Sequence, residues 1–236
     1  MMRPFTAMLS DNVLKKRVFK QGILDLHLKD FMIGQTTPYL NKFKHTLDIG
    51  AATGMYATHF ANHSKSVICF EAVLPVYNEL NKIKQFYNNV TTHNLAVSNF
   101  EGVSDFYVDD KRLSNSSFQN LVEGQKIQVD TVTIDSLKLV DVGFIKVDVE
   151  GVELDVLNGA SETIDEYKPT CMVEVYAKFN KYPVETTFDF FFDKGYRCFY
   201  NHKGQGLKPV RNIQEGIEAT KIPEITDGDF LFTVWL

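Results

Sequence analysis

The stretch Leu47–Gly54, which reads LDIGAATG, decides the fold of this 236-residue chain. Through glycine and small residues it joins a short apolar run, residues 46–49, to a segment that can form a helix, residues 55–63. The pattern predicts a strand, a tight turn and a helix. Glycine lets a backbone approach a ligand closely, and the first turn of a helix offers unpaired N–H groups. The turn is therefore a candidate site for a carboxylate or a phosphate.

A second predicted strand, residues 67–71, ends in an acid. Glu71 follows Asp48 by 23 residues, and an acid about 20 residues beyond a glycine turn is where doubly wound sheets hold the hydroxyls of a ribose. The spacing D-x-G-x-x-x-G lacks the G-x-G-x-x-G of a dinucleotide site and suits a nucleoside without a pyrophosphate, such as S-adenosylmethionine (SAM). We predict that SAM is bound by Asp48, Gly50, Ala51, Gly54 and Glu71, with Asn94 and Ala96 at the level of its adenine. In the alternative, the glycines only permit close packing.

Charge and cysteine usage limit the class of protein. The net charge of −5 argues against a nucleic-acid partner, because such proteins usually carry a basic surface. The three cysteines, Cys69, Cys171 and Cys198, lie far apart in apolar runs, which predicts reduced thiols rather than a zinc site. No apolar run has the length of a membrane span. These features predict a cytoplasmic protein, and they leave its oligomeric state open.

The chain divides into two predicted regions. Residues 1–45 carry an apolar stripe at helical spacing and are expected to form an N-terminal helical segment over the cofactor cleft or the sheet edge. Residues 46–236 alternate strand and helix patterns, which predicts one α/β domain with a mostly parallel sheet. Two late strands, residues 196–200 and 230–236, suggest an antiparallel pair at the sheet edge. Residues 98–130 and 201–229 are expected to be mostly loops that carry specificity, with 114–117 as a candidate substrate or lid loop. Two short strand-like pieces are expected near the first of these loops, at residues 104–108 and 127–133.

A second informative stretch, residues 144–153, reads FIKVDVEGVE. Lys146, Asp148 and Glu150 alternate within an apolar strand, where buried charges are costly unless they line a cleft. The next strand, residues 170–176, places Glu174 in another apolar run, so Asp148 and Glu174 are expected on adjacent strand ends. An ion pair with Lys146 is the structural alternative for Asp148 and Glu150. For Glu153 the structural alternative is a solvated acid in the first turn of a helix.

Six segments of the sequence together suggest a family. In this order and spacing they resemble the FkbM-type SAM-dependent methyltransferases over residues 46–200: LDIGAATG, VICFEA, HNLAVS, VDTVTIDSL, FIKVDVEGVELDVLNGA and KPTCMVEV. The resemblance implies the class I methyltransferase (Rossmann-like) fold, α/β, with a mostly parallel seven-stranded sheet. It also implies O-methylation of a sugar, a glycan or a small natural product. Ala52 and Ala72 depart from the family pattern, which usually has Asn and Pro there.

Methyl transfer to a neutral alcohol needs a base or a metal. Asp148, Glu150 and Glu174 could bind Mg²⁺, a hard cation that would lower the pKa of the acceptor oxygen. Alternatively, Asp148 or Glu153 takes the proton directly, with Lys146 favouring the developing oxyanion. The sequence leaves both routes open, so the predicted catalytic set is Lys146, Asp148, Glu150 and Glu153.

Two other functions share these features. A nicotinamide-dependent oxidoreductase has the same turn and acid but needs the missing G-x-G-x-x-G. A non-catalytic SAM- or nucleotide-binding module is consistent with Ala52 and Ala72, whereas the retained charges at Lys146, Asp148 and Glu150 argue against it.

Overall fold

The computed structural model describes residues 34–109, 117–119, 124–177, 180–202, 206–222 and 225–235. Residues 1–33 of the predicted N-terminal helical segment therefore lie outside the described residues, as do residues 114–116 of the candidate lid. Within residues 34–45, a short 3-10 turn, Thr37–Tyr39, precedes the first strand.

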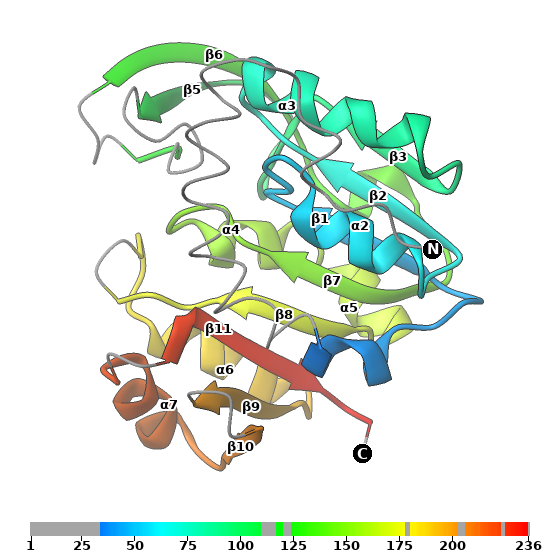
Figure 1. Ribbon diagram of the computed structural model, residues 1–236. Helices are drawn as coiled ribbons and strands as arrows, with labels where there is room; N and C mark the ends of the chain where they lie inside the picture. The colour runs from blue at the N-terminus through cyan, green and yellow to red at the C-terminus, as the bar shows by residue number, and fades with distance from the viewer. Residues whose placement is uncertain are drawn as a thin grey trace.

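An eight-stranded sheet forms the frame of the molecule (Figure 1). Its order is β10-β9-β11-β8-β7-β1-β2-β3. The five strands from β8 to β3 run parallel, whereas β11 is antiparallel to both β8 and β9, and β10 is antiparallel to β9. The strands are β1 His45–Ile49, β2 Ser66–Phe70, β3 Val90–His93, β7 Val142–Val147, β8 Thr170–Glu174, β9 Arg197–His202, β10 Leu207–Val210 and β11 Ile225–Thr233.

The antiparallel edge is larger than the predicted pair. Seven strands follow the expected arrangement, and β10 is added outside β9. The predicted loop 201–229 in fact contains β10 and the helix α7, Ile213–Thr220. The side chain of Asn212 caps α7 by accepting a hydrogen bond from the Glu215 N–H. Both elements are short and half polar, so their apolar periodicity is too weak to predict them.

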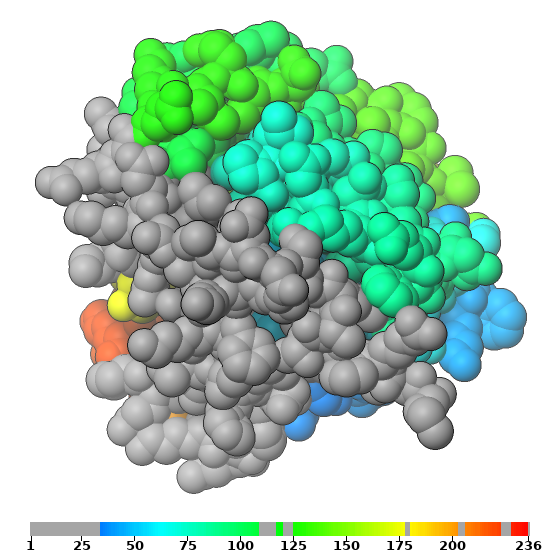
Figure 2. Space-filling model, turned by 45° about the horizontal axis from the view of Figure 1, so that its top comes forward, coloured from blue at the N-terminus to red at the C-terminus, as the bar shows by residue number. Residues whose placement is uncertain are grey.

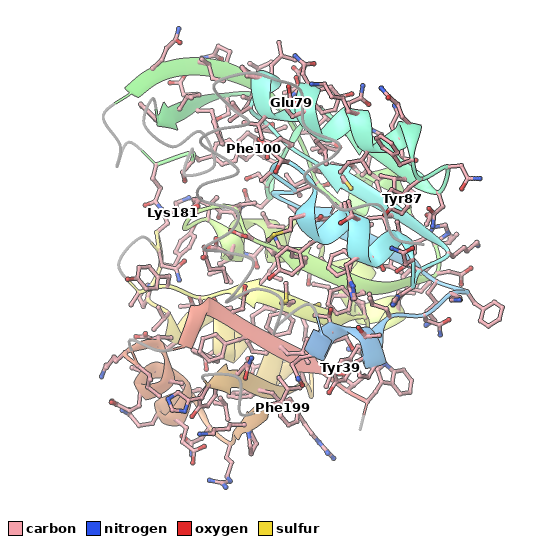
Figure 3. All side chains as sticks on the ribbon, viewed as in Figure 1. Tyr39, Glu79, Tyr87, Phe100, Lys181 and Phe199 are labelled. Atoms are coloured by element: carbon pink, nitrogen blue, oxygen red, sulfur yellow. The ribbon has the colours of Figure 1, made fainter. Side chains whose placement is uncertain are left out.

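Helices cover both faces of the sheet (Figure 1). One buried cluster joins α2 to the sheet and extends to Tyr39 and Phe199, which lie near each other in Figure 3. A second cluster joins α4, α5, α6 and α7 to the opposite face. The predicted helix 153–167 is broken at Gly159 and Ala160 into α4 and α5. Gly159 passes so close to Ser98 that a Cβ there would lie 2.1 Å from the Ser98 carbonyl oxygen. The helices are α2 Met55–Ala61, α3 Leu74–Leu80, α4 Glu153–Asn158, α5 Ser161–Tyr167 and α6 Glu185–Asp193.

A small second sheet lies beyond α3, at the top of Figure 1. It consists of β4 Ala96–Val97, β5 Gly102–Asp109 and β6 Gly124–Val132, in the order β4-β6-β5. Phe106, Val108 and Val129 pack against Val73 and Val76 of the α3 region in a third buried cluster. In Figure 2 these strands and α3 form one continuous surface. The two strand-like pieces predicted at 104–108 and 127–133 are confirmed as β5 and β6, and the hairpin is a packed part of the domain.

Across the described part of the chain, every helix is too short or too polar to cross a membrane.

Candidate active site

The glycine turn between β1 and α2 is tightly enclosed. The N–H groups of Gly50 and Ala51 both donate to the Phe70 carbonyl oxygen, at 3.1 and 3.0 Å. Gly50 has a φ of 73°, and a Cβ there would lie 1.8 Å from the Asp148 carbonyl oxygen. Gly54 has a φ of 84°, and its Cβ would meet the Ile83 side chain at 2.0 Å. Close packing therefore requires both glycines and brings the turn against the end of β7.

Glu71, directly after β2, fastens this turn to the neighbouring strand. Its Oε2 accepts the Ala52 N–H at 3.0 Å, and its Oε1 accepts the Val73 N–H at 2.8 Å. Burial raises the pKa of Glu71 to about 7. The Asn94 amide donates to the carbonyl oxygens of Glu71 and Ala72, at 2.8 and 2.9 Å. Because each carboxylate oxygen can accept a further hydrogen bond, Glu71 can also receive hydroxyl donors.

Lys146 is the buried cation at the centre of the site. The side chain of Lys146 is 3% exposed, and its Nζ lies 3.0 Å from Asp148 Oδ2 and 3.7 Å from Asp48 Oδ1. The same Nζ donates to the Gly50 carbonyl oxygen at 3.5 Å and lies 5.0 Å from the centroid of the Tyr56 ring. The strand register sets this contact, because Asp48 and Lys146 are paired neighbours on β1 and β7. The predicted alternative of an ion pair with Lys146 is confirmed for Asp148.

The turn after β7 is strained and strongly bonded. Strand β7 ends at Val147, and Glu150 and Gly151 adopt left-handed conformations with φ values of 58° and 101°. Glu153 Oε1 accepts the N–H groups of Val149 and Gly151, at 3.2 and 2.9 Å. Glu153 is 1% exposed, so the alternative of a solvated acid is wrong. Burial raises the pKa of Glu153 to about 7.

Several acids gather around Asp148. Its charge raises the pKa of Glu71, of Glu153 and of Glu174. Glu174 ends β8, which lies beside β7 as predicted. Burial, followed by the charge of Asp148, holds the pKa of Glu174 well above its usual range. Asp148 is thus the neighbour that these acids share, and its side chain keeps 19% of its surface exposed.

Two residues of this neighbourhood escaped the sequence reasoning. Asp229 pairs with Glu174 across β11 and β8, and the Tyr56 hydroxyl donates to Asp229 Oδ2 at 3.5 Å. The sequence feature that could have identified Asp229 is its position as an acid directly before an apolar run, residues 230–236, since Glu174 likewise lies in an apolar run. Nothing in the sequence distinguishes Tyr56 from an ordinary helix residue.

The predicted magnesium site is not formed. Among the residues that the structure describes, no group of three or more His, Cys, Asp or Glu side chains is arranged to hold a metal ion. Asp148 is paired with Lys146, and the strand ends before Glu150, so the alternation that would have placed Glu150 beside Asp148 stops at Val147. Asp148, Glu150 and Glu174 therefore do not fit Mg²⁺.

The predicted cofactor residues fall into two groups. Asp48, Gly50 and Glu71 lie at the carboxyl ends of β1 and β2, beside Asp148 and Lys146. Ala51 and Ala96 are each 5% exposed, and Ala96 belongs to the cluster under the hairpin. Contacts to a cofactor remain predictions for all of these residues: Asp48, Gly50, Ala51, Gly54, Glu71, Asn94 and Ala96.

Comparisons with known proteins identify a family by sequence and a similar fold by structure. The sequence matches the methyltransferase FkbM domain family over residues 48–198. No curated protein matches it in sequence. The structure is similar to methyltransferase FkbM from Methylobacillus flagellatus KT, with a TM-score of 0.55 and 15% identity over 97% of this chain and 56% of that protein. The chain therefore spans just over half the length of that protein.

Two further solved structures align more loosely. Precorrin-6y C5,15-methyltransferase from Geobacter metallireducens GS-15 gives a TM-score of 0.47 and 10% identity, over 88% of this chain and 87% of that one. Aeropyrum pernix fibrillarin, in complex with SAM, gives a TM-score of 0.44 and 12% identity, over 84% of this chain and 68% of that one. The similarity to the Methylobacillus structure shows a shared fold, and the predicted class I fold is confirmed.

Proposed function

Because the chain belongs to the methyltransferase FkbM domain family, we propose that it transfers a methyl group from SAM to a hydroxyl of a sugar, a glycan or a small natural product. The observation that carries the proposal is the convergence of Glu71, Lys146 and Asp148 on one end of the sheet, next to the Gly50 turn. It places Glu71, a candidate hydrogen-bond acceptor for the ribose hydroxyls, near Asp148, a candidate base.

The carboxylates at this end of the sheet suit the polar groups of SAM. The carboxylate of Glu71 is already aligned by two backbone N–H groups and can accept the hydroxyls of a ribose. Asp48 supplies negative charge beside the turn, which suits the ammonium group and the sulfonium of SAM. When bound, SAM supplies an electrophilic methyl group.

Asp148 is the best-placed base for the acceptor hydroxyl. It is partly exposed, whereas Glu153 is occupied by two backbone N–H groups. Lys146 donates to Asp148 Oδ2 at 3.0 Å and so fixes the carboxylate that would receive the hydroxyl proton. A positioned base typically contributes about 10²–10⁴-fold in rate. We therefore favour direct proton transfer over a metal.

A label-transfer assay tests this function. Wild-type protein is incubated with methyl-labelled SAM and a panel of methyl glycosides and simple phenols. Asp148→Asn is expected to reduce turnover by about 10²–10⁴-fold while the dissociation constant of S-adenosylhomocysteine (SAH) stays within a few-fold of wild type. Asp189→Asn, an exposed acid on α6, is the matched control.

Different failures have different meanings. Full turnover by Asp148→Asn removes Asp148 from the mechanism. Tight SAH binding with no transfer to any compound of the panel favours the non-catalytic binding module instead.

A further inference from the structure

A short segment of the β5–β6 insertion is bonded to the turn after β7. The Ser117 hydroxyl donates to the Glu150 carbonyl oxygen at 2.8 Å. The Gln119 side-chain amide donates to the Gly151 carbonyl oxygen at 3.2 Å. The two acceptors belong to Glu150 and Gly151, which have left-handed backbones and lie two and three residues after Asp148 in the chain.

The other end of this segment, residues 117–119, is anchored in the hairpin. Ser117 and Tyr107 exchange two backbone hydrogen bonds, at 3.0 and 2.8 Å. The ring of Phe118 packs edge-on against Phe106, with centroids 5.1 Å apart. Ser117 itself is only 3% exposed. The segment is therefore a rigid bridge from the packed hairpin to the turn.

The turn needs such support. A left-handed conformation is unfavourable for a residue with a Cβ, and it persists only where the surroundings hold it. Glu153 holds the N–H groups of the turn from inside, and the Lys181 N–H donates to the Gly151 carbonyl oxygen at 2.7 Å. In Figure 3, Lys181 lies at the edge where β7 and β8 end. The hydroxyl of Ser117 holds the remaining side, at the Glu150 carbonyl.

We propose that Ser117 and Gln119 are positioning residues, which hold the Glu150–Gly151 turn so that Asp148 keeps the orientation that methyl transfer requires. This inference rests on the proposed function. It gives the β5–β6 insertion an indirect role in catalysis, through the backbone of the turn rather than through contact with the substrates.

The test combines amide hydrogen exchange with steady-state kinetics on Ser117→Ala and Gln119→Glu. Ser117→Ala removes the hydroxyl, which also accepts the Gln119 N–H at 3.3 Å, and Gln119→Glu replaces the amide donor while keeping the shape of the side chain. Exchange at the amides of Gly151 and Lys181 is expected to accelerate about tenfold in the free enzyme. With the acceptor found in the panel, kcat is expected to fall about tenfold while the KM for SAM is unchanged.

Two controls separate positioning from general stability. Ser104→Ala, on β5, removes a hydroxyl that bonds within the hairpin, to the Asp105 carbonyl oxygen, and it should leave both measurements at wild-type values. Ser117→Thr keeps the hydroxyl and should restore kcat. Wild-type exchange at Gly151 in Ser117→Ala, or faster exchange with an unaltered kcat, would overturn the positioning role in an active enzyme. A wild-type enzyme that methylates nothing in the panel would instead refute the proposed function.

Discussion

Lys146→Met is the substitution whose cost can be worked most directly from the structure. Methionine matches the length of the lysine stem and can still pack against Tyr56, so the main change is the loss of one buried positive charge. At an effective dielectric constant of about 20, attraction at the observed 3.0 and 3.7 Å is worth ~5 kcal/mol for each carboxylate, most of it offset by desolvation. Removing the cation takes away the positive charge beside Asp48 and Asp148, and breaking a buried ion pair in this way typically costs about 3–5 kcal/mol.

Urea unfolding at pH 7 measures this loss. Lys138→Met is the matched control, because Lys138 is 77% exposed and lies 3.8 Å from the exposed Glu162, an arrangement worth about 0–1 kcal/mol. The double variant Lys146→Met/Asp148→Asn should recover part of the loss, since the negative charge of Asp148 is removed together with the positive charge of Lys146. A cost below about 1 kcal/mol for Lys146→Met would refute the argument that this lysine compensates buried carboxylates.

Two further predictions concern stability. Ala52 has a φ of 47°, which asparagine tolerates better than alanine, so Ala52→Asn should raise the free energy of unfolding by about 0.5–1 kcal/mol in urea titrations; an equal or lower value contradicts the strain argument. Burial raises the pKa of Glu153 from 4.5 to about 7, so the folded protein keeps a proton that the unfolded chain releases. Stability is therefore lost as the pH rises from 4.5 through about 7, by ~3 kcal/mol at most, and Glu153→Gln should lack this loss between pH 5 and pH 8; equal pH dependence in both proteins would argue against a protonated Glu153.

The residues that were predicted well share one property: the sequence places them where backbone geometry leaves few choices. The LDIGAATG turn and the acid at position 71 follow directly from strand ends and glycines, and the register then brings Asp48 beside Lys146. Asp148 and Glu174 were correctly assigned to adjacent strands because parallel strands in sequence order tend to be neighbours.

The errors arose where tertiary contacts override local patterns. The alternation of charges predicted that Glu150 would continue the strand, but β7 ends at Val147 and a left-handed turn follows. Glu153 resembled a solvated acid at a helix start, yet its carboxylate bonds backbone N–H groups of that turn. The contact between Ser117 and Glu150 joins residues 33 positions apart through an insertion, and no local pattern encodes it.

Calorimetric titration of SAH into wild type and Glu71→Gln tests the central claim most directly, since that claim places the ribose on the Glu71 carboxylate. Loss of hydrogen bonds to a charged group costs about 1.5–3 kcal/mol each, so the dissociation constant should rise at least about tenfold in Glu71→Gln. Glu79→Gln, on α3, should bind as the wild type does. Equal affinity for SAH in Glu71→Gln and wild type would contradict the account.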